Sequence, residues 1–111
     1  MQPPCCSIEA VADRHQLVIA TVGHASDGNL HPTLLVDPDD AEVMERARAA
    51  VAEIFRAALD LGGTLSGEHG IGSAKAPYLG WAIGESGLAL TRRVKAAFDP
   101  QGILNPGKFV G

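Results

Sequence analysis

Hydrophobic side chains recur at helical spacing over residues 41–61. Steps of three and four residues place them in one stripe, the side of a helix that faces a core. The stripe contains Met44, Ala47, Val51, Ile54, Ala58 and Leu61. Asp and Pro residues at 37–40 are typical of the end of a strand and the cap of a helix, and Gly62-Gly63 is typical of a helix end. The pattern therefore predicts one long helix.

Two short runs before this helix have the composition of strands. Residues 17–22 and 30–36 are apolar and rich in β-branched side chains. The intervening segment 23–29 contains Asp27-Gly28, a strong turn signal because Gly and Asn tolerate positive φ. We expect an antiparallel pair of strands joined by a functional loop, preceded by a short helix over residues 7–15.

The second half of the chain predicts helices and loops. A glycine-rich loop at 64–72 precedes a short helix at 76–83 and an amphipathic helix at 85–98. The inward positions predicted for this last helix are Leu90, Val94, Ala97 and Phe98. The fold class predicted is α+β, a small antiparallel sheet with helices packed on one face. Residues 1–6 are predicted to be irregular and residues 7–111 to form the domain. Two strands are few for a sheet, which indicates part of a larger domain.

Length and charge exclude several classes of function. The 111 residues suffice for one small domain, and 9 basic against 13 acidic residues give a net charge of −4. The densest basic group is Arg92, Arg93 and Lys95, which forms no stripe for a phosphate backbone, so nucleic-acid binding is not expected. No apolar run is long enough to span a bilayer and no signal pattern opens the chain, so a cytoplasmic location is expected. Cys5-Cys6 is either a metal-binding or oxidisable thiol pair or part of an unremarkable N-terminus.

Two histidines flank the predicted turn. His24 and His31 can face each other across a hairpin, and neutral imidazoles in that arrangement suit Zn²⁺ or a similar divalent ion. Their spacing is not that of a standard zinc motif. Two ordinary surface histidines are therefore the alternative interpretation.

A second group of candidate residues lies in the glycine-rich loop. Glu68 could complete a His-His-Glu metal set that leaves one position open, as in catalytic sites. His69 is then a candidate general base, because imidazoles exchange protons near neutral pH. A flexible surface loop with an incidental acid is the alternative. The segment 105–108, Asn-Pro-Gly-Lys, indicates by itself only a turn that carries a lysine.

Three segments together resemble a known family. GHASDGNLHP at 23–32, GGTLSGEHGIGSAK at 62–75 and FDPQGILNPGK at 98–108 are similar to the C-terminal domain of FAD-linked oxidases. That family includes the flavin subunit of glycolate oxidase, D-lactate dehydrogenase and D-2-hydroxyglutarate dehydrogenase. The resemblance covers residues 7–111. It implies that the metal ligands are His24, His31 and Glu68, that the substrate contacts are Thr33 and His69, and that the residue near the flavin is Asn105.

The resemblance also implies a reaction. A small 2-hydroxy acid would be oxidised at its α-hydroxyl, His69 would take the hydroxyl proton, and the hydride would pass to FAD. A divalent metal, expected to be zinc, would hold the substrate. FAD would be bound mainly by a domain absent from this chain, so the partners expected are a flavin-domain chain or electron-transfer subunits. The alternatives are a truncated, non-catalytic remnant or partner module, and a metal-binding or structural module without redox chemistry.

Overall fold

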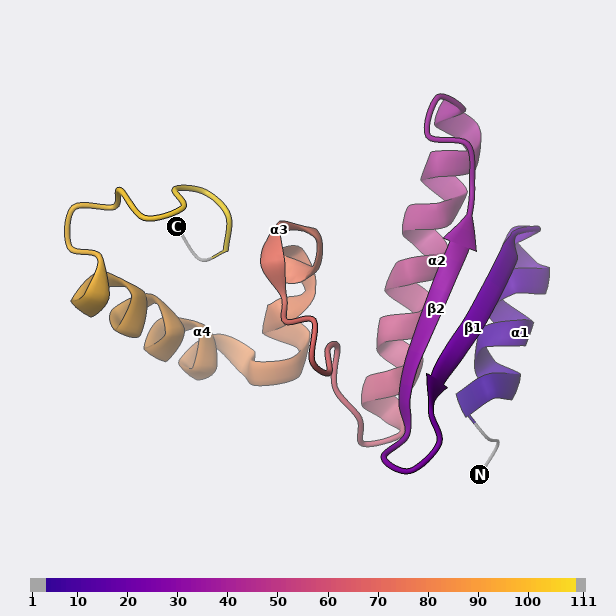
Figure 1. Cartoon of the computed structure of the whole chain (residues 1–111), viewed down its shortest axis with the longest axis horizontal. Coiled ribbons are helices and arrows are strands. Elements are labelled where there is room, and N and C mark those ends of the chain that lie inside the picture. Colours follow the sequence, from indigo (N-terminus) through magenta and orange to yellow (C-terminus); the bar gives the residue numbers. More distant parts are fainter. Residues whose placement is uncertain (1–3, 110–111) are drawn as a thin grey trace. The chain divides into compact units, whose positions relative to one another are not determined.

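The computed structural model describes residues 4–109, with side chains described from Ser7 onward (Figure 1). The chain divides into two compact units, which meet in the sequence at Gly63 and Thr64. Each unit is described by itself. The first contains, in order, helix α1 (Pro4–His15), strand β1 (Val18–His24), strand β2 (Asn29–Leu35) and helix α2 (Ala41–Asp60).

Strands β1 and β2 form the predicted antiparallel hairpin. The register pairs Val18 with Leu35 at one end and His24 with Asn29 beside the turn. The amide of Gly28 donates to the carbonyl of His24 at 3.1 Å, and Gly28 has a φ of 73°. The turn thus depends on the glycine at which the sequence predicted it. Strand β1 extends two residues beyond the predicted end, so His24 belongs to the strand itself.

One face of the hairpin is covered by helices α1 and α2, which lie side by side behind it in Figure 1. The strand positions that alternate toward the helices, such as Ile19 and Leu34, are half-buried. Val18 and Val22 point to the other face and are 65% and 68% exposed. Burial of one face only is the arrangement that the predicted α+β class describes, and it is confirmed in this unit. The buried apolar side chains of the unit are Ile8, Val11, Ala47 and Ala50.

Both ends of α2 are held by local hydrogen bonds. The Asp40 carboxylate accepts from the amides of Glu42 and Val43 at 3.0 and 3.1 Å, which satisfies donors that a helix start leaves open. At the other end the amide of Gly62 donates to Leu59 and that of Gly63 to Ala58, a Schellman motif with Gly62 at a φ of 81°. The predicted long helix and both of its boundaries are confirmed to within a residue.

Helix α1 differs from its prediction at the start. It begins at Pro4, so residues 4–6 are helical and the prediction of an irregular segment over 1–6 is wrong there. A proline is well tolerated in the first turn because its missing amide would have no helical partner. The side chains of Cys5 and Cys6 lie outside the described residues, so the thiol-pair hypothesis stays a prediction.

The second unit is built from α3 (Gly72–Lys75), the 3₁₀ turn η1 (Ala76–Tyr78) and α4 (Leu79–Phe98). Gly84 interrupts α4 with a φ of 64° and a ψ of 180°, so two helical segments meet at that residue. The sequence predicted two helices separated at this position, and the break is confirmed. Glycine permits it because it lacks a Cβ.

The predicted inward face of α4 is wrong. Leu90, Val94 and Phe98 are 59%, 49% and 82% exposed, and Ala97 is exposed as well. The buried apolar residues of this unit are instead Leu65 and Leu79. Periodicity identifies an apolar stripe but not whether an element covers it. Among the described residues, no helix has both the length and the apolar character needed to cross a membrane.

Candidate functional site

His24 and His31 lie in contact on the exposed face of the hairpin. In the register His31 pairs with Val22, two residues before His24, so the two histidines are diagonal neighbours on one face. Their ring centroids are 5.3 Å apart and the rings meet edge to face at 87°. The sequence predicted two histidines facing across a hairpin; the structure brings them together diagonally.

Gly23 allows the strands to approach closely beside this histidine pair. A Cβ at that position would lie 2.6 Å from the Asn29 carbonyl oxygen and 2.9 Å from Leu30 Cδ2. Such distances are well below van der Waals contact, so only glycine fits without a shift of the backbone. The residue therefore sets the strand spacing next to His24.

The chemistry of the histidine pair fits a divalent cation. Imidazole nitrogens suit zinc and neighbouring transition metals, and two neighbouring rings offer two of the three protein ligands of a typical catalytic site. An edge-to-face contact between aromatic rings is also stable without an ion. The two histidines are thus candidates for two of the metal ligands, and a third ligand must come from another part of the protein.

Thr33 lies on the same face of the hairpin as the histidines. It pairs with Ala20, is exposed, and follows His31 by two residues, a separation of about 7 Å along a strand. A hydroxyl can both donate and accept hydrogen bonds. The exposed face therefore offers the imidazole of His24 on β1 and, on β2, the imidazole of His31 and the hydroxyl of Thr33, with the apolar Val22 opposite His31.

Glu68 and His69 lie at an exposed loop in the second unit. Ser66 donates to the carbonyl of Gly70 at 2.5 Å, which closes the loop between them, and Gly70 has a φ of 72°. Lys75 of α3 donates to the Ser66 hydroxyl at 3.2 Å. This closure keeps the two functional candidates at the tip.

The Glu68 and His69 side chains are exposed and approach each other. They are 51% and 72% exposed, and Glu68 Oε1 lies 3.8 Å from His69 Nε2. A neutral imidazole has one ring nitrogen that accepts a hydrogen bond and one that donates. Sequence reasoning identified both residues but could not identify the contribution of Ser66 and Lys75, which depends on how the loop closes.

Asn105 lies beside a cavity in the second unit. The cavity has a volume of about 540 Å³, with Phe98, Leu104 and Phe109 as its apolar wall and with Asn105 and Lys108 among its polar residues. Asn105 has a φ of 48°, a left-handed conformation that asparagine tolerates better than most residues. An amide and an ammonium beside an apolar wall fit part of a planar heteroaromatic cofactor.

Sequence reasoning missed the residue that organises this segment. Asp99 follows the last turn of α4, and only 2% of its side chain is exposed. A hydrogen bond from Lys95, followed by those from the amides of Leu104 and Ile103, lowers the pKa of Asp99 below its ordinary value of 3.8, against the opposing effect of burial. The sequence signal was an Asp just after a helix and before proline, a position favoured for side-chain capping of a turn.

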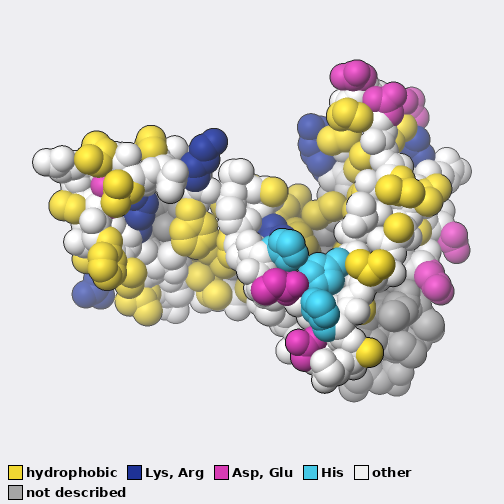
Figure 2. Space-filling model, viewed as in Figure 1, with side chains coloured by type: hydrophobic (Ala, Val, Ile, Leu, Met, Phe, Trp, Pro, Cys, Tyr) yellow, Lys and Arg dark blue, Asp and Glu magenta, His cyan; other side chains and the backbone are white. Residues whose placement is uncertain are grey.

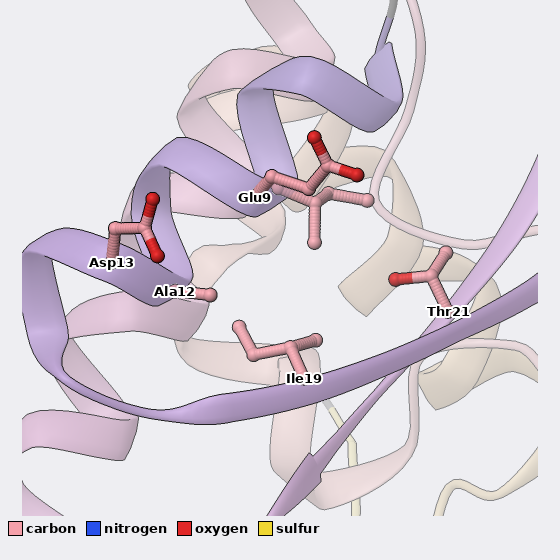
Figure 3. Close-up of a pocket in the computed structure, with 6 residues that line it drawn as sticks. Glu9, Ala12, Asp13, Ile19 and Thr21 are labelled. Atoms are coloured by element: carbon pink, nitrogen blue, oxygen red, sulfur yellow. The ribbon is translucent and has the colours of Figure 1, made fainter.

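A second, smaller cavity of about 280 Å³ lies between α1 and β1. Figure 3 shows Glu9 and Asp13 from the helix and Thr21 from the strand around it, with Ile19 on the strand side. None of the candidate residues named above lines it. Two solvent-facing carboxylates are common on helices, and the cavity has no further feature that indicates a ligand.

This chain is similar over most of its length to a known protein family and to several named proteins. The family described as FAD linked oxidases, C-terminal domain, matches residues 5–109. The glycolate oxidase subunit GlcD of Bacillus subtilis is 50% identical over 103 residues, which are 93% of this chain and 22% of that protein. GlcD of Escherichia coli K12 is 39% identical over 93% of this chain and 21% of its own length. A mitochondrial D-lactate dehydrogenase (cytochrome) of Arabidopsis thaliana is 36% identical over 88% of this chain and 17% of its own. The chain thus spans about a fifth of the length of these relatives.

Proposed function

Because the chain belongs to the family of FAD-linked oxidase C-terminal domains, we propose that it is the substrate- and metal-binding part of an FAD-dependent 2-hydroxy-acid dehydrogenase. The proposed reaction oxidises the α-hydroxyl of a small 2-hydroxy acid, of the glycolate or D-lactate type, to a keto group. Relatives named for glycolate and D-lactate support this substrate class. The structural observation that carries the proposal is the contact between His24 and His31 on an exposed strand face.

The metal ligands we propose are His24, His31 and Glu68. Two imidazoles and a carboxylate are a common donor set for catalytic zinc, which leaves one position for substrate. A divalent ion, proposed to be zinc, would supply polarisation of the α-hydroxyl. Support comes from the paired rings on β1 and β2 and from the exposed carboxylate of Glu68.

The residues proposed to act on the substrate are His69 and Thr33. His69 would take the proton of the α-hydroxyl on a ring nitrogen, and its Nε2 lies 3.8 Å from Glu68 Oε1. The Thr33 hydroxyl would hydrogen-bond the substrate from the exposed strand face. Loss of that proton makes departure of the Cα hydride easier.

The proposed cofactor is FAD, which when bound supplies the acceptor for the Cα hydride. Asn105 would contact the flavin, and the support is its place beside a cavity with an apolar wall. Because this chain spans only about a fifth of the length of the matched relatives, we propose that most of the flavin is held by a separate flavin domain. Electron-transfer subunits and a cytoplasmic location belong to the same proposal.

Calorimetric titration of the 111-residue chain with Zn²⁺, Mn²⁺ and Co²⁺ tests the metal site. We expect binding of at least one ion, its loss in His24→Ala and in His31→Ala, and a 10- to 100-fold or greater weakening in Glu68→Gln, by analogy with the effect of residues that support a metal. His69→Ala is the matched control, because it removes an imidazole that is not proposed as a ligand. A wild-type chain with no affinity for any of the three ions would show that the metal assignment is wrong.

A further inference from the structure

The carboxylate of Asp99 accepts three hydrogen bonds. Its Oδ1 accepts from the amide of Ile103 at 2.9 Å, and its Oδ2 accepts from the amide of Leu104 at 3.0 Å and from the ammonium of Lys95. Lys95 also donates to the carbonyl of Leu104 at 2.8 Å. Asp99 and Lys95 therefore fix both backbone polar groups of Leu104, the residue directly before Asn105.

The segment that follows α4 depends on these bonds because it has no helix or strand of its own. Residues 101–109 are exposed, and Leu104 remains 56% exposed. Beyond Leu104 the turn closes when the amide of Lys108 donates to the carbonyl of Asn105 at 3.3 Å. A short turn without apolar burial opens readily unless its ends are held. Here one end is held by an ion pair at the end of a helix, in which the carboxylate is buried and the ammonium is partly exposed.

We propose that Asp99 and Lys95 are positioning residues, which hold the 103–108 turn so that Asn105 and Lys108 are presented together at the 540 Å³ cavity. The inference rests on the proposed function, in which Asn105 contacts the flavin. Neither Asp99 nor Lys95 needs to touch the cofactor. Their contribution is preorganisation, which reduces the ordering that binding would otherwise require.

The charged groups beside the cavity also support a positioning role for Asp99 and Lys95. Lys95 and Asp99 both border the cavity, and their ion pair neutralises the lysine. Lys108 then supplies the net positive charge beside the cavity. If asparagine replaces Asp99, Lys95 becomes a second cation there, and one acceptor oxygen remains where the amides of Ile103 and Leu104 each had one. The electrostatics of the cavity and the order of the turn therefore change together.

Amide exchange of the 111-residue chain tests the first step. We expect Asp99→Asn to accelerate exchange at the amides of Ile103 and Leu104 by about tenfold or more, because asparagine has one acceptor oxygen where the carboxylate has two and presents an NH₂ donor in place of the other. Lys95→Met provides a second variant should Asp99→Asn fold poorly, and Lys95→Arg should restore slow exchange. Arg93→Met, which removes an exposed cation from the same helix, should have no effect on these amides. Unchanged exchange in both Asp99→Asn and Lys95→Met would overturn the proposal.

The second step uses the flavin-loaded protein, whether its flavin domain is on the same polypeptide or on a partner. We expect Asp99→Asn and Asn105→Ala each to weaken FAD retention by about tenfold and to shift the visible flavin absorbance, with helix content unchanged. If Asn105→Ala has this effect and neither Asp99→Asn nor Lys95→Met does, the proposed role of Asp99 and Lys95 is wrong, while the proposed contact of Asn105 with the flavin is supported. If none of the three variants changes FAD retention or absorbance, Asn105 does not contact the flavin. The positioning role of Asp99 and Lys95 is then wrong as well.

Discussion

At the scale of single residues, the candidate metal site depends on a glycine that carries no chemistry. Gly23 precedes His24 and pairs with Leu30 across the hairpin. The nearest atom to an added Cβ would be a backbone oxygen, that of Asn29, which no rotamer change can move. The distance between the strands beside His24 is therefore set by the absence of a side chain.

We predict that Gly23→Ala destabilises the first unit by about 1–3 kcal/mol, the usual range for overpacking, and separates the His24 and His31 rings. Urea unfolding followed by circular dichroism measures the first effect, and nuclear Overhauser contacts between the rings measure the second. Gly28→Ala is the matched control. A Cβ added at Gly28 meets no atom within 4 Å, so the only cost, about 1–2 kcal/mol, comes from the positive φ of this residue. The contact between the His24 and His31 rings should persist. An alanine at 23 with wild-type stability and ring contacts would contradict this account.

At the scale of elements, α1 and α2 are joined by polar contacts as well as by their apolar faces. Glu53 of α2 accepts a hydrogen bond from Arg14, and its other oxygen lies 2.8 Å from His15 Nε2. Arg46 of α2 donates to the carbonyls of His15 and Gln16 at 3.1 and 3.2 Å, where α1 ends. A cation at a helix C-terminus satisfies open carbonyls and opposes the helix dipole. Helix α2 thus caps the helix beside it.

The Glu53 contacts predict a dependence of stability on pH. The hydrogen bond with His15, and then that with Arg14, lowers the pKa of Glu53 below its ordinary value of 4.5. A carboxyl whose pKa is lower when folded stabilises the fold fully above its unfolded pKa and loses that effect as the pH falls through the folded pKa. We expect the free energy of unfolding to fall as the pH is lowered below about 4.5.

Unfolding in urea at a series of pH values between about 7 and 3 measures this dependence. Glu53→Gln should reduce the slope below pH 4.5. Glu45→Gln is the control, since Glu45 pairs with Arg48 at 3.3 Å on an exposed face and such pairs contribute little. Equal slopes for wild type and Glu53→Gln would rule out Glu53 as a source of the acid sensitivity.

The sequence predicted those features of the elements that depend on neighbours in the chain. Asp40 and Gly62 were predictable as helix boundaries because capping bonds span a few residues. The contacts of Glu53 join residues 38 and 39 positions apart, and no local pattern indicates them. The diagonal placement of His24 and His31 follows from the register of the hairpin, which the exact turn sets. The exposed stripe of α4 shows the same limit, since periodicity does not identify a covering element.

At the scale of the whole molecule, few apolar side chains are buried and many are exposed. Figure 2 shows hydrophobic side chains at the surface of both units. On the open face of the hairpin they include Val18, Val22 and Leu35, and on α4 they include Leu90 and Val94. Exposed apolar patches of this kind mark surfaces that contact other protein or cause association. The open strand face is also the face that carries the histidine pair.

We predict that the isolated 111-residue chain binds the dye ANS and associates with itself as its concentration rises. Val22→Thr and Leu90→Gln should reduce both effects and change the free energy of unfolding by less than about 0.5 kcal/mol, as is usual at exposed positions. Val11→Thr is the control: this side chain is only 1% exposed, so a buried hydroxyl there should destabilise by about 1–3 kcal/mol. ANS fluorescence, sedimentation velocity and urea unfolding provide the three measurements.

The pattern across these variants distinguishes an open surface from a covered one. If the hairpin face and the α4 stripe are open in solution, Val22→Thr and Leu90→Gln alter association and leave stability unchanged. If either position instead costs as much stability as Val11→Thr, its side chain is covered in the isolated chain, and the exposure on which this prediction rests is wrong. For Val22 that result would bear on function as well, because a covered strand face would leave His24, His31 and Thr33 inaccessible to a substrate in the isolated chain.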